Sequence, residues 1–309
     1  MPRLLSTLLV LVLLGATTAA FAVTEGLKLE PSPISATKVD KVFSPTCACS
    51  TDLATIRFRL RKTDRLTVAI VDSGGHVVRT LLGGKLRGPG RKSFIWNGLD
   101  SQNVPVSDGS YKPRIHLRRA HRTILLPNPI VVDTVAPRAT LVGFHPAVLS
   151  PDGDHRHDVL RVHYRLSEPA RALLYVNGVL RVKVKQFRTD GELRWYGKVD
   201  GVPLPAGSYR IELRGQDRAG NVTEAGPAAT LRVRYIELSP RVVHVRAQTR
   251  FGVRVSTDAK RYRWRLGKRR GVGRQRVLVL RAGYAGRYRL VVTARGHSAT
   301  TVVIVGRRP

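Results

Sequence analysis

The sequence Thr55-Ile-Arg-Phe-Arg-Leu60 alternates apolar side chains with polar ones, and the alternation returns 106 residues later in Arg161-Val-His-Tyr-Arg-Leu166. Alternation of period two is typical of a β-strand that buries one face. Two further features recur at the same offset, Ser44-Pro45 as Ser150-Pro151 and Asp52 as Asp158. The repetition predicts a domain of about a hundred residues that occurs twice.

The second half of each copy repeats at a smaller offset. Trp96 and Gly109-Ser-Tyr111 recur as Trp195 and Gly207-Ser-Tyr209, at offsets of 99 and 98, so the second copy has lost several residues in its middle. A third segment carries a similar mark in Gly286-Arg-Tyr288. In immunoglobulin-like sandwiches a tyrosine near the start of the penultimate strand often hydrogen-bonds back to the backbone. We therefore predict that Tyr111, Tyr209 and Tyr288 are core or corner residues.

Short strands separated by turn signals run through the chain after residue 22. Turn residues cluster at Asp72-Ser-Gly74-Gly75, Gly88-Pro-Gly90 and Ala219-Gly220-Asn221, and no stretch spaces apolar residues helically for three turns. This pattern predicts an all-β protein made of tandem immunoglobulin-like β-sandwich domains. We place these domains at residues 41–135, 136–236 and 237–309.

The first 22 residues have the features of a signal peptide. Arg3 supplies positive charge, residues 4–14 form a short apolar core, and Ala20-Phe-Ala22 offers small residues at a cleavage site. We expect export to the cell envelope or the medium, a linker at residues 23–40, and no transmembrane helix after cleavage. The alternative is an uncleaved anchor, although a span needs about 20 strongly apolar residues.

Several short motifs resemble the immunoglobulin-like module of flagellar hook-capping proteins and of other bacterial surface and secreted proteins. The first copy carries Asp72-x-Gly74-Gly75, Trp96-Asn97-Gly98 and Gly109-x-Tyr111; the second carries Trp195-x-Gly197, Gly207-x-Tyr209 and Asp217-x-Ala219-Gly220-Asn221. The resemblance covers residues 41 to 235 and implies the fold. It does not imply one function, because such modules serve as spacers, assembly parts and binding units. The third segment is more weakly similar to a PKD-type sandwich around Tyr262-Arg-Trp264-Arg-Leu266-Gly267.

Signatures of catalysis are missing from the sequence. It contains no Gly-x-Ser-x-Gly elbow, no His-Glu-x-x-His, no phosphate-binding loop and no dinucleotide fingerprint. We therefore expect that the protein is not an enzyme. Cys47 and Cys49 would close a very tight ring if they bridged each other, and linkage to a second chain or free thiols are the alternatives. We favour a structural or incidental role for them.

An acidic loop, Ser150-Pro-Asp152-Gly-Asp154-His-Arg-His157-Asp158, offers the most plausible metal site in the sequence. Calcium takes several oxygen ligands from a tight, turn-rich loop, which makes Asp152, Asp154 and Asp158 its candidate ligands. Zinc at His155 and His157 is the weaker alternative, because no third ligand accompanies them. The loop could equally be an acidic turn in which Asp158 caps the following strand, since the first copy keeps only Asp52 of the three carboxylates.

The positive charge is concentrated near the C-terminus. The chain has a formal net charge of +33, and residues 236–309 hold 19 Lys and Arg against 2 acidic residues, a net charge of +17. Alternating arginines on a strand place positive charge on one face of a sheet. The candidate residues for binding an anionic polymer are Arg261, Arg263, Arg265, Lys268, Arg269 and Arg270.

These features favour an exported binding or scaffold protein whose basic third domain contacts an anionic envelope polymer, such as teichoic-type phosphates, acidic polysaccharide or lipid headgroups. The rival interpretation is a structural or accessory module of a larger surface assembly that binds another protein. Nucleic-acid binding fits the charge but is disfavoured by export. The basic charge could also be compositional, because Arg outnumbers Lys 42 to 12.

Overall fold

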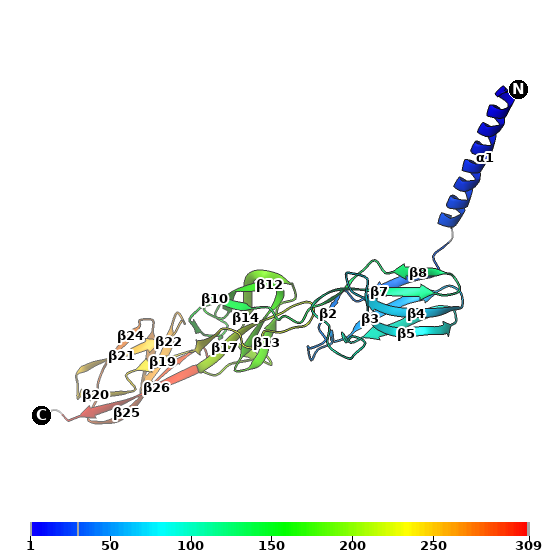
Figure 1. Cartoon of the computed structure of the whole chain (residues 1–309). Helices are drawn as coiled ribbons and strands as arrows, with labels where there is room; N and C mark the ends of the chain where they lie inside the picture. Colours follow the sequence, from blue (N-terminus) through cyan, green and yellow to red (C-terminus); the bar gives the residue numbers. More distant parts are fainter. Residues whose placement is uncertain (1, 30, 308–309) are drawn as a thin grey trace. The chain divides into compact units, whose positions relative to one another are not determined.

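The structure, a computed structural model, describes residues 2–29 and 31–307 (Figure 1). Residues Pro2–Leu29 form one helix, α1, which contains the described part of the predicted signal peptide, and strands β1 to β26 make up the regular structure after it. No helix in the described ranges combines the length and hydropathy needed to cross a membrane. The prediction of an all-β fold with immunoglobulin-like sandwiches is confirmed.

The chain divides into two compact units, residues 1–134 and 135–309. In the first unit, one sheet has the strand order β1-β3-β6; the other has the order β2-β9-β7-β4-β5, with β8 paired to β7. Together they enclose a core that includes Phe43, Phe58, Trp96 and Ile115. The strands are β1 (Ile34–Val39), β2 (Val42–Phe43), β3 (Ala54–Leu60), β4 (Asp64–Val71), β5 (Val77–Arg87), β6 (Gly90–Trp96), β7 (Gly109–Leu117), β8 (Arg122–Leu125) and β9 (Ile130–Val132).

Strand β1 corrects the predicted linker at residues 23–40. Residues Ile34–Val39 pair antiparallel with β3, and Ile34 and Val39 bury their side chains in the first core. Only the two ends of this strand are buried, because a bulge between Ser35 and Lys38 interrupts its register. The strand therefore lacks the regular alternation by which strands are recognised in a sequence.

The second unit begins with a sandwich whose longest strand serves both of its sheets. Residues 161–166 of β12 pair with β10 and residues 160–165 pair with β14. Residues 171–176 pair with β17, and residues 173–176 also pair with β13. The first sandwich uses two separate strands here, β3 and β4. The strands are β10 (Ala139–His145), β11 (Val148–Leu149), β12 (Leu160–Val176), β13 (Val179–Lys183), β14 (Arg188–Trp195), β15 (Lys198–Val199), β16 (Val202–Pro203), β17 (Gly207–Gln216) and β18 (Ala228–Val233).

A third core lies in the same unit between two further sheets, with the strand orders β19-β21-β24 and β20-β26-β25-β22-β23. Tyr262 and Leu266 are buried in this core, and Trp264 packs against it half-buried. The strands are β19 (Glu237–Ser239), β20 (Val242–Arg246), β21 (Arg250–Ser256), β22 (Tyr262–Leu266), β23 (Arg269–Gly273), β24 (Val277–Arg281), β25 (Gly286–Ala294) and β26 (His297–Gly306).

The three Gly-x-Tyr motifs adopt one local arrangement. Each tyrosine lies near the start of a strand and donates its phenolic O–H to the backbone carbonyl four residues earlier: Tyr111 to Ser107 at 2.8 Å, Tyr209 to Pro205 at 2.8 Å, and Tyr288 to Tyr284 at 2.9 Å. The hydrogen bond ties the loop to the strand that follows it. These are the corner contacts that the sequence predicts.

Candidate functional site

The basic residues of β22 lie on the outer face of the five-stranded sheet of the third core. Arg263 and Arg265 are exposed, while Tyr262 and Leu266 point into the core. The register places Arg270 of β23 opposite Arg265, so both side chains lie on the outer face. Strand β25 adds Arg287 and Arg289, which are exposed and alternate with partly or fully buried neighbours. We call these five arginines the basic face.

Two glycines hold the hairpin of β22 and β23 in this register. Gly271 lies opposite Trp264, and a Cβ atom on Gly271 would lie 2.7 Å from the indole ring. Gly273 lies opposite Tyr262 with equally little room. The aromatic rings therefore lie flat against the backbone of β23, the arrangement by which aromatic side chains compensate for glycine in a strand. This packing on the inner side leaves the arginines on the outer side.

The basic face has few counter-charges. Arg265 and Arg270 are direct cross-strand partners, a like-charged pairing that is unfavourable unless an anion lies nearby. The third domain has only two acidic residues, Glu237 and Asp258. Glu237 binds Arg232 of β18 at 2.8 Å, and Asp258 is buried against the second sandwich. Neither carboxylate therefore neutralises the basic face.

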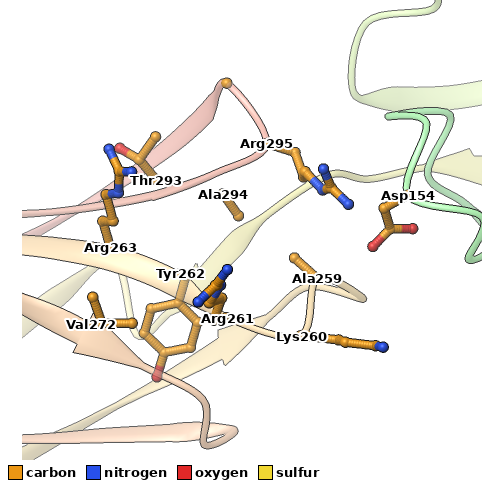
Figure 2. A pocket seen from close by; sticks show the side chains of 11 residues that line it. Asp154, Ala259, Lys260, Arg261, Tyr262, Arg263, Val272, Thr293, Ala294 and Arg295 are labelled. Atoms are coloured by element: carbon orange, nitrogen blue, oxygen red, sulfur yellow. The ribbon is translucent and has the colours of Figure 1, made fainter.

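One end of the basic face opens into a cavity of about 720 Å³ (Figure 2). Lys260, Arg261, Arg263 and Arg295 line it from the third domain, and Asp154 reaches it from a loop of the second. Arg295 comes from the turn between β25 and β26 and extends toward Asp154 (Figure 2). The cavity has the dimensions and charge to take an anionic group of small-molecule size.

The six predicted basic residues do not share one surface. Arg263, Arg265 and Arg270 lie on the basic face, and Arg261 lies in the cavity at its end. Lys268 lies in the turn of the hairpin. Arg269 lies opposite the buried Leu266 and donates to the carbonyl oxygen of Arg281 in the other sheet at 2.6 Å, so its side chain spans the edge of the sandwich.

Sequence reasoning missed four cations of this surface, Lys260, Arg287, Arg289 and Arg295. The alternation Gly286-Arg-Tyr-Arg289 repeats the pattern of β22 and could have identified the two arginines of β25. Lys260 lies in the loop between β21 and β22, and Arg295 lies in a turn, so no periodicity marks either residue.

The acidic loop before β12 is ordered by one of its own carboxylates. Asp158 accepts hydrogen bonds from the backbone N–H groups of Gly153 at 2.8 Å and His155 at 2.6 Å, one on each oxygen. Asp152 and Asp154 each accept from the backbone N–H two residues later, at 3.2 and 2.8 Å. Asp158 thus holds the loop in its turn.

A third carboxylate near Asp152 and Asp154 comes from Asp258, in the loop between β21 and β22. One oxygen of each of these three side chains lies within 4.8 Å of the other two. Ser150 donates its hydroxyl to Oδ1 of Asp258 at 3.0 Å, and Arg156 donates to its backbone carbonyl at 3.0 Å. Burial, together with the charges of Asp154 and Asp258, raises the pKa of Asp152 to about 6. Neither His155 nor His157, the predicted zinc ligands, belongs to this cluster.

The two cysteines form a disulfide bond with each other, although their separation is only two residues. They lie in the loop between β2 and β3, the counterpart of the acidic loop in the first sandwich. From the sequence we argued against this bridge because its ring would be very tight, and the structure corrects that expectation.

Comparison with known proteins supports the fold of the first sandwich. The family model of the FlgD Ig-like domain matches residues 48–120. The assignment of the second copy to the same family, and of the third segment to a PKD-type sandwich, remain predictions. No curated protein matches the sequence.

Several solved structures resemble the chain over most of its length. The chain matches a solved chain from work on a 1.5-MDa bacterial ice-binding adhesin at 15% identity and a TM-score of 0.30, over 88% of this chain and 97% of that solved chain. Extracellular domains 3–5 of Drosophila OTK match at 14% identity and a TM-score of 0.22, over 90% and 98% of the two chains. E. coli alpha-2-macroglobulin matches at 10% identity and a TM-score of 0.26, over 89% of this chain and 22% of that one. The present chain therefore spans about a fifth of the length of that protein.

Proposed function

We propose that this chain is an exported scaffold protein of the cell envelope or the extracellular space, and that the basic face of its third domain binds an anionic polymer. The observation that carries the proposal is the set of five exposed arginines on one sheet, in a domain whose two carboxylates contact the second sandwich instead. A cavity lined by Lys260, Arg261, Arg263 and Arg295 continues this surface at one end.

The spacing of the arginines favours an extended ligand over a small one. Neighbouring strands lie about 4.8 Å apart, and residues two apart along a strand are separated by roughly 6.8 Å. Arg263 and Arg265 lie opposite Thr293 and Val291, so Arg289 and Arg287 follow beyond Arg265 along the neighbouring strand, and the four arginines form a staggered row. Repeating phosphate or carboxylate groups can meet such a row at several points, and each guanidinium can form two hydrogen bonds to one group.

The binding prediction is tested with the full chain on immobilised polyphosphate, with neutral dextran as the blank. Replacing Arg263, Arg265, Arg270, Arg287 and Arg289 with Gln should weaken binding roughly 50- to 100-fold at low salt, since each exposed ion contact contributes on the order of 0.5 kcal/mol. Binding by the native chain should fall steeply as salt rises, because exposed charges are screened within about 8 Å at physiological ionic strength.

A control variant removes the same number of positive charges from the first sandwich. Arg57, Arg59, Arg61, Lys85 and Arg91 are exposed there, and their replacement with Gln should leave polymer binding nearly unchanged. Equal losses in both variants would mean that only net charge matters, and the proposed binding face would then be wrong. If neither variant loses affinity for isolated envelope material, a protein partner in a surface assembly becomes the better interpretation.

Export makes a separate prediction. The positive N-terminus, the short apolar core and the Ala20-Phe-Ala22 site should direct cleavage before Val23. Mass spectrometry of the protein recovered from the medium or from a high-salt wash of whole cells should show a chain that begins at Val23. Recovery of the chain only in the membrane fraction, still beginning at Met1, would contradict this expectation.

A further inference from the structure

Two loops from different sandwiches bring three carboxylates together within the second unit. Asp152 and Asp154 belong to the loop between β11 and β12, and Asp258 belongs to the loop between β21 and β22. Their nearest oxygens lie within 4.8 Å of one another. We propose that Asp152, Asp154 and Asp258 bind a calcium ion that joins the second sandwich to the third. This inference does not rest on the anionic-polymer proposal.

An independent observation at Asp258 points to a cation. Its side chain is only 9% exposed, and its Oδ2 atom is buried without a hydrogen-bond donor among the described residues. Nδ1 of the His157 imidazole lies 3.7 Å from Oδ2, beyond hydrogen-bond distance. A buried carboxylate oxygen in this position is costly unless it is paired. A metal ion between the two loops would provide the missing partner.

The arrangement suits calcium better than magnesium. Calcium binds oxygen at 2.3–2.6 Å, so two oxygens on opposite sides of the ion lie about 4.8 Å apart. Magnesium requires 2.0–2.1 Å and near-ideal octahedral geometry, which corresponds to about 4.1 Å across the ion. The three oxygens all lie within 4.8 Å of one another, close enough to share one calcium ion. They come from two separate loops, and calcium's flexible coordination tolerates such a ligand set better than the near-ideal octahedron of magnesium does.

The charge around the cluster sets a limit on the affinity. Burial raises the pKa of Asp258, and burial with neighbouring carboxylates raises that of Asp152, so the three negative charges disfavour one another without a counter-ion. Lys260 and Arg295 also line the cavity beside Asp154 (Figure 2). Their positive charges weaken the attraction of the carboxylate cluster for a calcium ion. We therefore expect a dissociation constant of about 10⁻⁴ to 10⁻³ M, as in extracellular calcium modules.

The proposal revises the calcium site that the sequence predicts. Both oxygens of Asp158 are occupied by backbone N–H groups, so Asp158 shapes the loop and Asp258 takes its place as a ligand. This difference makes the site testable by substitution. Asp258→Asn keeps an oxygen that can accept the hydrogen bond of Ser150 but removes the negative charge.

The experiment uses the full chain without polymer, stripped of metal, and measures calcium binding by equilibrium dialysis with radioactive calcium. One ion should bind per chain, with binding by Asp258→Asn and Asp154→Asn weakened at least tenfold. The comparison variant Asp158→Asn, which loosens the loop without removing a ligand, should lower the thermal stability of the chain and weaken calcium binding clearly less than Asp258→Asn does. In parallel, 10 mM calcium should raise the melting temperature of the native chain by about 3 °C, and 10 mM magnesium by clearly less.

The outcomes separate the proposal from its alternatives. Absence of saturable calcium binding by the native chain overturns it and leaves an acidic turn. Unchanged affinity in Asp258→Asn, with loss in Asp158→Asn, overturns the domain-bridging site and restores a site within the one loop. Neither result affects the polymer-binding measurement, which is made with the basic-face variant in the absence of calcium.

Discussion

Trp96→Ala should destabilise the first sandwich by about 3–5 kcal/mol, the usual cost of truncating a buried aromatic side chain to alanine. Trp96 is 1% exposed, and its ring packs edge-on against Phe43 and Tyr111, with centroid distances of 5.4 and 5.2 Å. Its indole N–H also donates to the carbonyl oxygen of Leu99 at 3.0 Å. The substitution removes the packing of both sheets at once and leaves that carbonyl without its donor.

Hydrogen exchange followed by mass spectrometry measures this loss separately for each sandwich. Protection in β3, β4 and β7 should fall by roughly 100- to 4000-fold, because every 1.4 kcal/mol corresponds to a factor of ten. The neighbouring Ile95 is 60% exposed on the same strand, and Ile95→Ala should change protection little. Polymer binding through the basic face should survive Trp96→Ala. A variant with native protection in these strands would show that Trp96 does not hold the two sheets together.

Gly226→Ala should destabilise the second sandwich by about 3 kcal/mol, at the upper end of the cost of overpacking. A Cβ atom on Gly226 would overlap the backbone carbonyl oxygen of Leu213 in β17. The backbone cannot move away freely, because the N–H of Leu213 donates to the carbonyl of Pro227 at 3.1 Å and the N–H of Gly226 donates to Glu212 at 3.2 Å. Relief of the overlap therefore requires a break in the contact between β17 and the start of β18.

The matched control is Gly143→Ala in β10 of the same sandwich. Nothing lies within 4 Å of the position that its Cβ would occupy, and alanine should be tolerated there. Urea unfolding of the two variants, followed by circular dichroism, should show a lower midpoint for Gly226→Ala alone. If both glycine variants unfold at the native midpoint, the close approach between Gly226 and Leu213 carries no stability.

The sequence by itself determined the strands, the corner tyrosines and the basic character of the third domain. These features depend on local order along the chain: alternation of period two in Thr55–Leu60 and Tyr262–Leu266, and a Gly-x-Tyr motif that bonds four residues back. A strand turns successive side chains to opposite faces wherever it lies, so such patterns can be read without tertiary information. The irregular β1 escaped detection because its bulge removes the alternation.

Only the tertiary structure decided which residues from distant segments meet. Asp152 and Asp258 are 106 residues apart, and nothing in either loop marks the other as a neighbour. Likewise, Arg269 continues a basic run but spans the sandwich edge, whereas Arg289 joins the basic face from another strand. The overlap that keeps position 226 a glycine is with a backbone atom of β17, thirteen residues earlier in the chain. In each case the deciding distance is set by the packing of strands and sandwiches, which local sequence patterns do not encode.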